Sequence, residues 1–135
     1  ADPAARQAVS IVLGRGLTAV LATQPIFPDI AGRQRMAWAG IDDLPFALVT
    51  TYETSHFCKP HPEYFLEVAA SINCAPGDCL FVGNDGIEDT VARQVGMRAY
   101  LVTDYLTNGD RAVSRGSRRG PLRNLPSFLH SLFPE

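Results

Sequence analysis

The sequence has no apolar run approaching the roughly 18 residues that a membrane-spanning helix needs. It also has no strong excess of one charge, because 12 basic and 14 acidic residues leave a formal net charge of −2. These two properties give no reason to expect a membrane or a nucleic acid as partner. At 135 residues and 46% hydrophobic composition, the chain fits one domain with a substantial core.

Cysteine is scarce, with only Cys58, Cys74 and Cys79, and no CxxC pair occurs. An odd count without that spacing argues against a disulfide framework and against a structural zinc site. We therefore expect a reducing, cytoplasmic setting. His56, Cys58 and His61 lie close together as an alternative metal site, but their spacing fits no common ligand pattern.

The chain has no internal repeat, and helical periodicity alternates with short apolar runs. This alternation predicts an α/β layered fold with a mainly parallel sheet. The predicted strands are Thr18 to Ala22, Phe46 to Thr51, Cys79 to Val82 and Arg98 to Thr103. The first predicted helix follows the cap pair Asp2-Pro3 and ends at Gly14, and the second covers Pro28 to Gly40. A third helix begins at Pro62, a fourth begins near Glu88, and a closing helix covers Leu122 to Phe133.

A polar segment from Asn108 to Gly120 precedes the closing helix and is rich in glycine, serine and arginine. Its arginines, with Arg123, are candidates for binding phosphate or nucleic acid. We favour a solvated loop, because no aromatic residues interleave with the arginines to stack on bases.

Polar side chains follow three of the predicted strands, where ligands bind in open parallel sheets. Thr23-Gln24 follows the first strand, Lys59-Pro60 follows the second after a short loop, and Gly83 to Asp89 follows the third. Taken singly, these groups are also typical of a strand-end turn, a surface lysine and a well-capped helix start. Together, a hydroxyl, an ammonium and an acidic cluster predict a site for phosphate and Mg²⁺.

Each residue type suits one role at such a site. A threonine hydroxyl and nearby backbone N–H groups can hold phosphoryl oxygens, and a lysine can neutralise their charge. Magnesium prefers carboxylate and water oxygens and usually takes one or two protein carboxylates. Asp85 and Asp89 are four residues apart, so one helical turn places both on the same face.

With these motifs in this order, the chain resembles a known family, the haloacid-dehalogenase-like (HAD) hydrolases. The resemblance rests on Leu21 to Pro25, Lys59 to Phe65 and Val82 to Asp89, which are similar to the second, third and fourth motifs of that family. It covers almost the whole chain, from the first helix to Asp104. It implies a Rossmann-like three-layer core, Mg²⁺ and phosphatase activity through an aspartyl-phosphate intermediate.

Carried over residue by residue, the resemblance implies that Thr23 and Lys59 are catalytic. Thr23, Gln24 and Lys59 would bind phosphate, and the metal ligands would be Asn84, Asp85 and Asp89. One departure is that the family has aspartate where Asn84 stands. We therefore expect Asp85, aided by Asn84, to make the principal metal contact.

The second departure is that the first motif of the family, an apolar strand ending in Asp-x-Asp, is absent. Asp2 is better interpreted as a helix cap, and Asp104 has leucine two residues later. We therefore expect residues 1–135 to be the C-terminal part of one HAD-like core domain. The nucleophile strand and a cap domain would lie upstream and complete the sheet.

The sequence thus predicts a magnesium-dependent phosphomonoesterase acting on a small phosphorylated metabolite, inactive without the upstream aspartate. A dehalogenase-type hydrolase is one alternative, although that reaction generally needs no magnesium. A non-catalytic binding or regulatory module is another, and Asn84 supports it. A dinucleotide-binding domain is disfavoured because no GxGxxG follows a strand.

Overall fold

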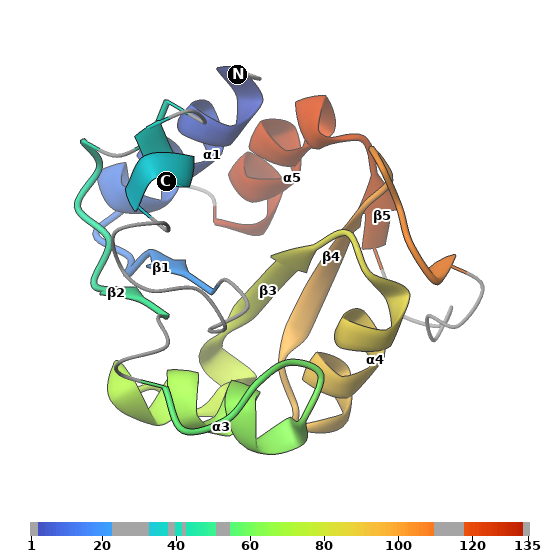
Figure 1. Cartoon of the computed structure of the whole chain (residues 1–135). Helices are drawn as coiled ribbons and strands as arrows, with labels where there is room; N and C mark the ends of the chain where they lie inside the picture. Colours follow the sequence, from blue (N-terminus) through green and yellow to red (C-terminus); the bar gives the residue numbers. More distant parts are fainter. Residues whose placement is uncertain are drawn as a thin grey trace. The chain divides into compact units, whose positions relative to one another are not determined.

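The chain alternates helices with short strands that pair in parallel (Figure 1). The computed structural model describes residues 3–22, 33–37, 40–41, 43–50, 55–109 and 118–133. It divides into two compact units, Ala1–Ser55 with Leu122–Glu135, and His56–Pro121. The predicted α/β class with parallel sheets is confirmed. No helix in the described ranges is long and apolar enough to cross a membrane.

The first unit contains two packed helices and a small sheet. Helix α1 (Pro3–Gly14) packs against helix α5 (Leu125–Leu132), and strands β1 (Val20–Leu21) and β2 (Leu48–Val49) pair in parallel. Each helix buries a pair of residues four apart, which places the pair on one face. These pairs are Ala4 with Ala8 and Leu125 with Leu129, all at most 5% exposed.

The predicted elements of this unit are present but shorter than expected. Both strands lie inside their predicted ranges, and residues 33–37 are helical within the predicted helix 28–40. The closing helix is divided, because Leu122–Asn124 forms a 3₁₀ turn before α5. Pro126 has no N–H to donate to the carbonyl of Leu122, so the α-helix begins only at Leu125. The Asp2 cap lies outside the described residues.

The second unit has a three-stranded parallel sheet in the order β3-β4-β5. Helix α4 packs on β3 and β4 and also contacts helix α3. The strands are β3 (Leu80–Gly83), β4 (Arg98–Val102) and β5 (Arg118–Gly120). The helices are α3 (Pro62–Ser71), a 3₁₀ turn η1 (Pro76–Asp78) and α4 (Gly86–Gln94). The predictions for α3, β3, α4 and β4 are confirmed to within two residues.

Aromatic side chains join α3 to the sheet. Phe65 of α3 meets Phe81 of β3 edge to face at 5.3 Å between ring centroids, and it meets Tyr64 at the same distance and a similar angle. Such edge-to-face pairs add to the stabilisation from burial. In β4 the residues from Ala99 to Val102 are all buried, as expected for a central parallel strand covered on both faces.

Strand β5 corrects one expectation. Residues 108–120 were predicted to form a solvated loop, yet Arg118–Gly120 pairs with β4 and Thr103 N–H donates to Gly120 O at 2.9 Å. Ladder bonds use only backbone groups, so polar side chains that face solvent do not prevent an edge strand. Residues 110–117 lie outside the described ranges.

The carboxylate of Glu67 on α3 is hydrogen-bonded to His56, in the segment before the helix. Glu67 accepts the backbone N–H of His56 at 2.9 Å, and its second oxygen lies 2.7 Å from His56 Nδ1. Burial raises the pKa of Glu67, but the contacts with His56 outweigh this and lower it overall. A lowered folded-state pKa means that the stabilisation is present above the unfolded pKa and is lost as the pH falls through the folded pKa.

We therefore expect Glu67→Gln to lower the unfolding free energy at pH 7 by about 0.2–1 kcal/mol, the range for partly exposed contacts of a charged side chain. The difference from wild type should shrink below about pH 4, where the unfolded carboxyl is protonated. Urea denaturation at both pH values measures this. Glu63→Gln removes the same charge from the same helix and serves as control. A deficit that is unchanged in acid would contradict the assignment.

Candidate functional site

Lys59 is the only lysine of the chain, and its side chain is largely buried in the second unit. Its Nζ lies 3.0 Å from Glu88 Oε1 in the first turn of α4, with side-chain exposures of 13% and 20%. The same Nζ lies 5.9 Å from the centroid of the Phe81 ring on β3. Partial burial strengthens both interactions relative to water. The ammonium is thus held where β3 leads into α4.

Gly83 is the last residue of β3, and the ring of Phe81 leaves no room for a larger side chain there. A Cβ atom at this position would lie 2.8 Å from Cε2 of Phe81, which is too close for any larger residue without a shift of the ring. The backbone angle of Gly83 is not in the left-handed region. The glycine therefore allows Phe81 to pack beneath Lys59.

The acidic cluster forms the beginning of α4, as predicted. Asp85 is the N-cap residue, and its Oδ1 accepts the N–H of Ile87 at 2.8 Å. Glu88 and Asp89 occupy the first turn, where the helix dipole favours negative charge. Asp89 is only 1% exposed. The well-capped helix start therefore exists, and it carries three carboxylates in five residues.

The segment after β4 holds this loop in place through its backbone. Thr107 N–H donates to Asn84 O at 2.9 Å, and Gly86 N–H donates to Thr107 O at 2.9 Å. This bridge connects the turn after β3 to the turn after β4 in parallel. We call residues 105–108 the strap, because they fix the backbone on both sides of Asp85.

Side-chain hydrogen bonds complete the connection to the strap, and in one of them Thr107 Oγ1 donates to Asn84 O at 3.4 Å. Asn84 Nδ2 donates to Tyr105 O at 3.3 Å, and Asn108 Nδ2 donates to Asp85 Oδ1 at 3.4 Å. Tyr105 and Asn108 both have positive φ, at 53° and 51°, a conformation that costs free energy for residues other than glycine. Asn84 and Asp85 thus have hydrogen-bonding roles in the loop besides any role as ligands.

The structure brings several of the predicted site residues together. Lys59 lies against α4, whose first turn and cap carry Asp85 and Asp89, with Asn84 directly before them. Thr23 and Gln24 lie outside the described residues, so their place beside this cluster stays a prediction.

Sequence reasoning missed Glu88 as the partner of Lys59. The available signal was its position in the first turn of the helix, three residues after the cap. A partly buried lysine needs an opposite charge nearby.

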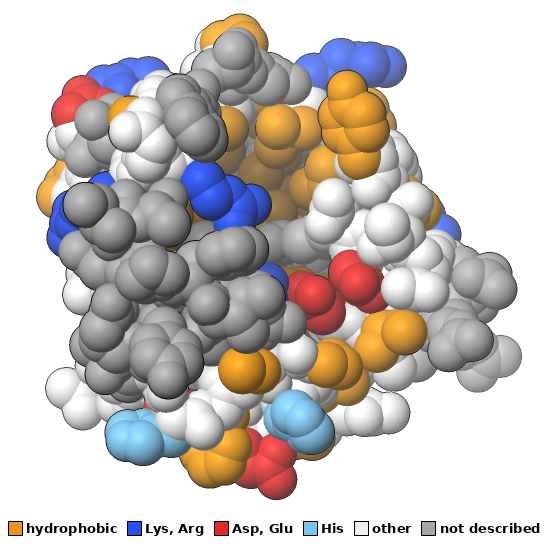
Figure 2. Space-filling model, in the orientation of Figure 1, with side chains coloured by type: hydrophobic (Ala, Val, Ile, Leu, Met, Phe, Trp, Pro, Cys, Tyr) orange, Lys and Arg blue, Asp and Glu red, His pale blue; other side chains and the backbone are white. Residues whose placement is uncertain are grey.

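The described residues contain no group of three or more histidine, cysteine, aspartate or glutamate side chains arranged around a metal position. His56, Cys58 and His61 are all described and do not form such a group. The loop 84–89 offers carboxylate and amide oxygens, the donors that Mg²⁺ prefers, and Mg²⁺ keeps several waters. Asp85, Glu88 and Asp89 do not form such a group in this structure, so the loop offers donors for only part of a magnesium shell. Figure 2 shows acidic side chains gathered beside a basic one near the middle of the visible face.

Comparison with known proteins identifies the fold. No family model matches the sequence, and a search of curated proteins returned no match either. Solved structures do match. A HAD phosphatase from Thermococcus onnurineus is 25% identical with a TM-score of 0.70, over 90% of this chain and 54% of that chain.

Two further structures match over nearly the whole chain. A putative beta-phosphoglucomutase from Thermotoga maritima is 18% identical with a TM-score of 0.79, over 98% of this chain and 61% of that chain. The L-2-haloacid dehalogenase from Xanthobacter autotrophicus is 17% identical with a TM-score of 0.76, over 97% and 61%.

The chain has the fold of the HAD hydrolases. The resemblance indicated by the three sequence motifs is therefore confirmed at the level of fold, and the matching structures include a HAD phosphatase, beta-phosphoglucomutases and haloacid dehalogenases. The chain spans about half the length of the first matching structures, with 54%, 46% and 56% of those chains covered. The described part of this HAD-like chain includes the loop 84–89 and Lys59.

The Lys59–Glu88 pair yields a direct prediction. Glu88→Gln removes a negative charge 3.0 Å from a mostly buried ammonium, so the unfolding free energy should fall by about 1.5–3 kcal/mol, the typical value for a hydrogen bond to a charged group. Lys59→Met should also destabilise the protein. The double variant should lose at least about 0.5 kcal/mol less than the sum of the two single losses.

Urea denaturation of the four proteins measures this coupling. Glu63→Gln combined with Lys59→Met is the matched control, because Glu63 is an exposed acid on α3. Its effect should add to that of Lys59→Met. If the losses of unfolding free energy in Lys59→Met and Glu88→Gln also add up in the double variant, the two side chains do not interact in solution.

Proposed function

We propose that this chain forms the phosphate-binding and magnesium-binding part of a HAD-type phosphomonoesterase that acts on a small phosphorylated metabolite. The observation that carries the proposal is the position of Lys59, whose ammonium is fixed 3.0 Å from Glu88 beside a loop rich in carboxylates. A cation for phosphate and oxygen ligands for a metal therefore occur in one unit. The similarity of fold to a HAD phosphatase supports the same reaction class.

Each residue has a separate role in this proposal. Lys59 neutralises the negative charge that spreads over the phosphoryl oxygens, and Thr23 and Gln24 donate hydrogen bonds to those oxygens. Asn84, Asp85 and Asp89 would hold Mg²⁺. When bound, the metal supplies further positive charge next to the phosphate. Phosphoryl transfer depends mainly on such positioning and electrostatic stabilisation.

The proposed reaction passes through an aspartyl-phosphate, and its nucleophile must come from elsewhere in the same protein. The sequence contains no Asp-x-Asp, and Asp104 has Leu106 where a second acid would stand. Among the described strands, β3 pairs with β4 alone, and its Val82 is 38% exposed. We propose that a strand ending in Asp-x-Asp pairs with this open edge of β3, and that a cap domain chooses the substrate.

A non-catalytic binding module is the second candidate. The observation in its favour is that Asn84 stands where the family has aspartate and donates its amide N–H to Tyr105 O. Dehalogenase chemistry agrees with the fold of several neighbours, but the carboxylates of the loop favour a metal-dependent phosphatase. The cytoplasmic setting expected from cysteine usage stays a prediction.

The test compares this chain with a longer product of the same reading frame. We expect only a product that includes an Asp-x-Asp to hydrolyse para-nitrophenyl phosphate, and only with Mg²⁺, because no electrostatic group replaces a covalent nucleophile. Asp89→Asn in that product should lower the rate by a factor on the order of 10²–10³, the usual loss for one stabilising group. Initial rates with and without a chelator measure both effects.

Two results would refute the phosphatase proposal. One is hydrolysis by this chain alone at the rate of the longer product. The other is release of chloride from 2-chloropropionate by the longer product, without hydrolysis of the phosphate ester. The absence of an upstream Asp-x-Asp would favour the binding module instead.

A further inference from the structure

Cys74 closes helix α3 and is held rigidly there. Its N–H donates to Ala69 O at 3.0 Å, and Asn73 N–H donates to Ala70 O at 3.1 Å. Asn73 has a φ of 55°, so the helix ends in a left-handed residue with the two hydrogen bonds of a Schellman motif. The backbone of Cys74 is therefore fixed by the end of the helix.

Cys79 is fixed from the other side by the sheet. Its N–H donates to Pro76 O at 3.0 Å, and its carbonyl accepts the N–H of Arg98 at 3.1 Å, at the start of the β3–β4 ladder. Cys74 and Cys79 thus stand on two well-anchored elements, with only four residues between them.

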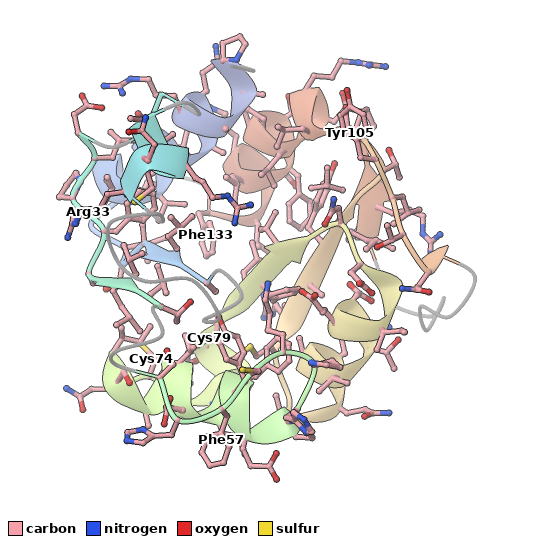
Figure 3. All side chains as sticks on the ribbon, viewed as in Figure 1. Arg33, Phe57, Cys74, Cys79, Tyr105 and Phe133 are labelled. Atoms are coloured by element: carbon pink, nitrogen blue, oxygen red, sulfur yellow. The ribbon has the colours of Figure 1, made fainter. Side chains whose placement is uncertain are left out.

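The connection between the two cysteines is a tight turn. Asp78 N–H donates to Ala75 O at 2.9 Å, which brings the ends of residues 75–78 within the 7 Å that defines a β-turn. The thiol of Cys79 folds back over this turn, because its Sγ lies 3.5 Å from Ala75 O, the residue that follows Cys74. Figure 3 labels both cysteines in the region where α3 leads into β3.

The electrostatics of the two thiols agree with this geometry. Burial raises the pKa of Cys79, and the negative charge of Cys74 and of Asp78 raises it further. The Cys74 thiol lies 3.6 Å from Ile72 O, at the end of α3. Both thiols are free and partly exposed, so a small reagent can reach them.

We propose that Cys74 and Cys79 are a redox modification site that closes as a reversible disulfide across this turn. The oxidant is a low-molecular-weight disulfide such as oxidised glutathione. One cysteine thiolate attacks the oxidant and releases its first thiol, and the second thiolate attacks the mixed disulfide and releases the other. The protein loses two protons and two electrons, and the oxidant becomes two thiols.

The consequence is a covalent link between the end of α3 and the start of β3. Lys59 lies just before α3 and the loop 84–89 follows β3, so the disulfide restrains two elements that carry the candidate site. A disulfide stabilises mainly by constraining the unfolded chain, and a short loop gives a modest effect. The thermal midpoint should therefore rise on oxidation. This inference does not depend on the phosphatase proposal.

The third cysteine provides the matched control. The chain is incubated with oxidised glutathione at neutral and at mildly alkaline pH, and the products are identified by mass spectrometry and peptide mapping. We expect the Cys58→Ser variant to lose two hydrogen atoms, with a bond between residues 74 and 79, and a reductant should reverse the change. Closure should be faster at alkaline pH, because the raised pKa of Cys79 limits its thiolate.

The single variants distinguish closure from simple modification. Cys74→Ser and Cys79→Ser should each retain one glutathione adduct at the remaining member of the pair, since no second thiol resolves it. Stable glutathione adducts in Cys58→Ser, without the internal bond, would overturn the proposal. A wild-type disulfide that involves residue 58, or a thermal midpoint unchanged by closure, would also overturn it.

Discussion

The contact between Lys59 and Glu88 is the interaction on which the candidate site depends. It joins the single lysine of the chain to the first turn of α4 at 3.0 Å, over the ring of Phe81. Because both side chains are mostly buried, neither charge is easily left alone. The pair therefore fixes the position of an ammonium group beside the carboxylates of the same turn. Gly83 is required for the same reason, since it leaves room for the ring beneath the lysine.

A second constraint comes from the strap. Backbone bonds from Thr107 to Asn84 and Gly86 determine where the loop after β3 lies, and Asn108 contacts the carboxylate of Asp85. The two positive-φ residues of the strap show that backbone strain is accepted to maintain these contacts. Two neighbouring strand ends thus behave as one rigid support. Such support is what an electrostatic site needs, because catalysis of phosphoryl transfer depends on positioned charges.

Much of the fold could be predicted, because periodicity reports burial directly. The helix from Pro62, the strand from Arg98 and the acidic start of α4 follow from local sequence alone. Strand β5 could not be predicted, since its pairing uses backbone groups and its side chains are polar. The partner of Lys59 was missed for a related reason. Sequence spacing gives the positions of charges along the chain, but the choice between neighbouring acids depends on side-chain packing.

The central proposal is that Lys59 and the loop 84–89 form one site for an anion and a metal ion. Labelling lysine with ¹³C gives a single side-chain NMR signal, because the chain has one lysine. We expect sub-stoichiometric Mn²⁺ to broaden this signal, orthophosphate to shift it, and Asp89→Asn to weaken the broadening. Mn²⁺ that broadens signals elsewhere, while the Lys59 signal stays sharp and insensitive to phosphate, would contradict the account.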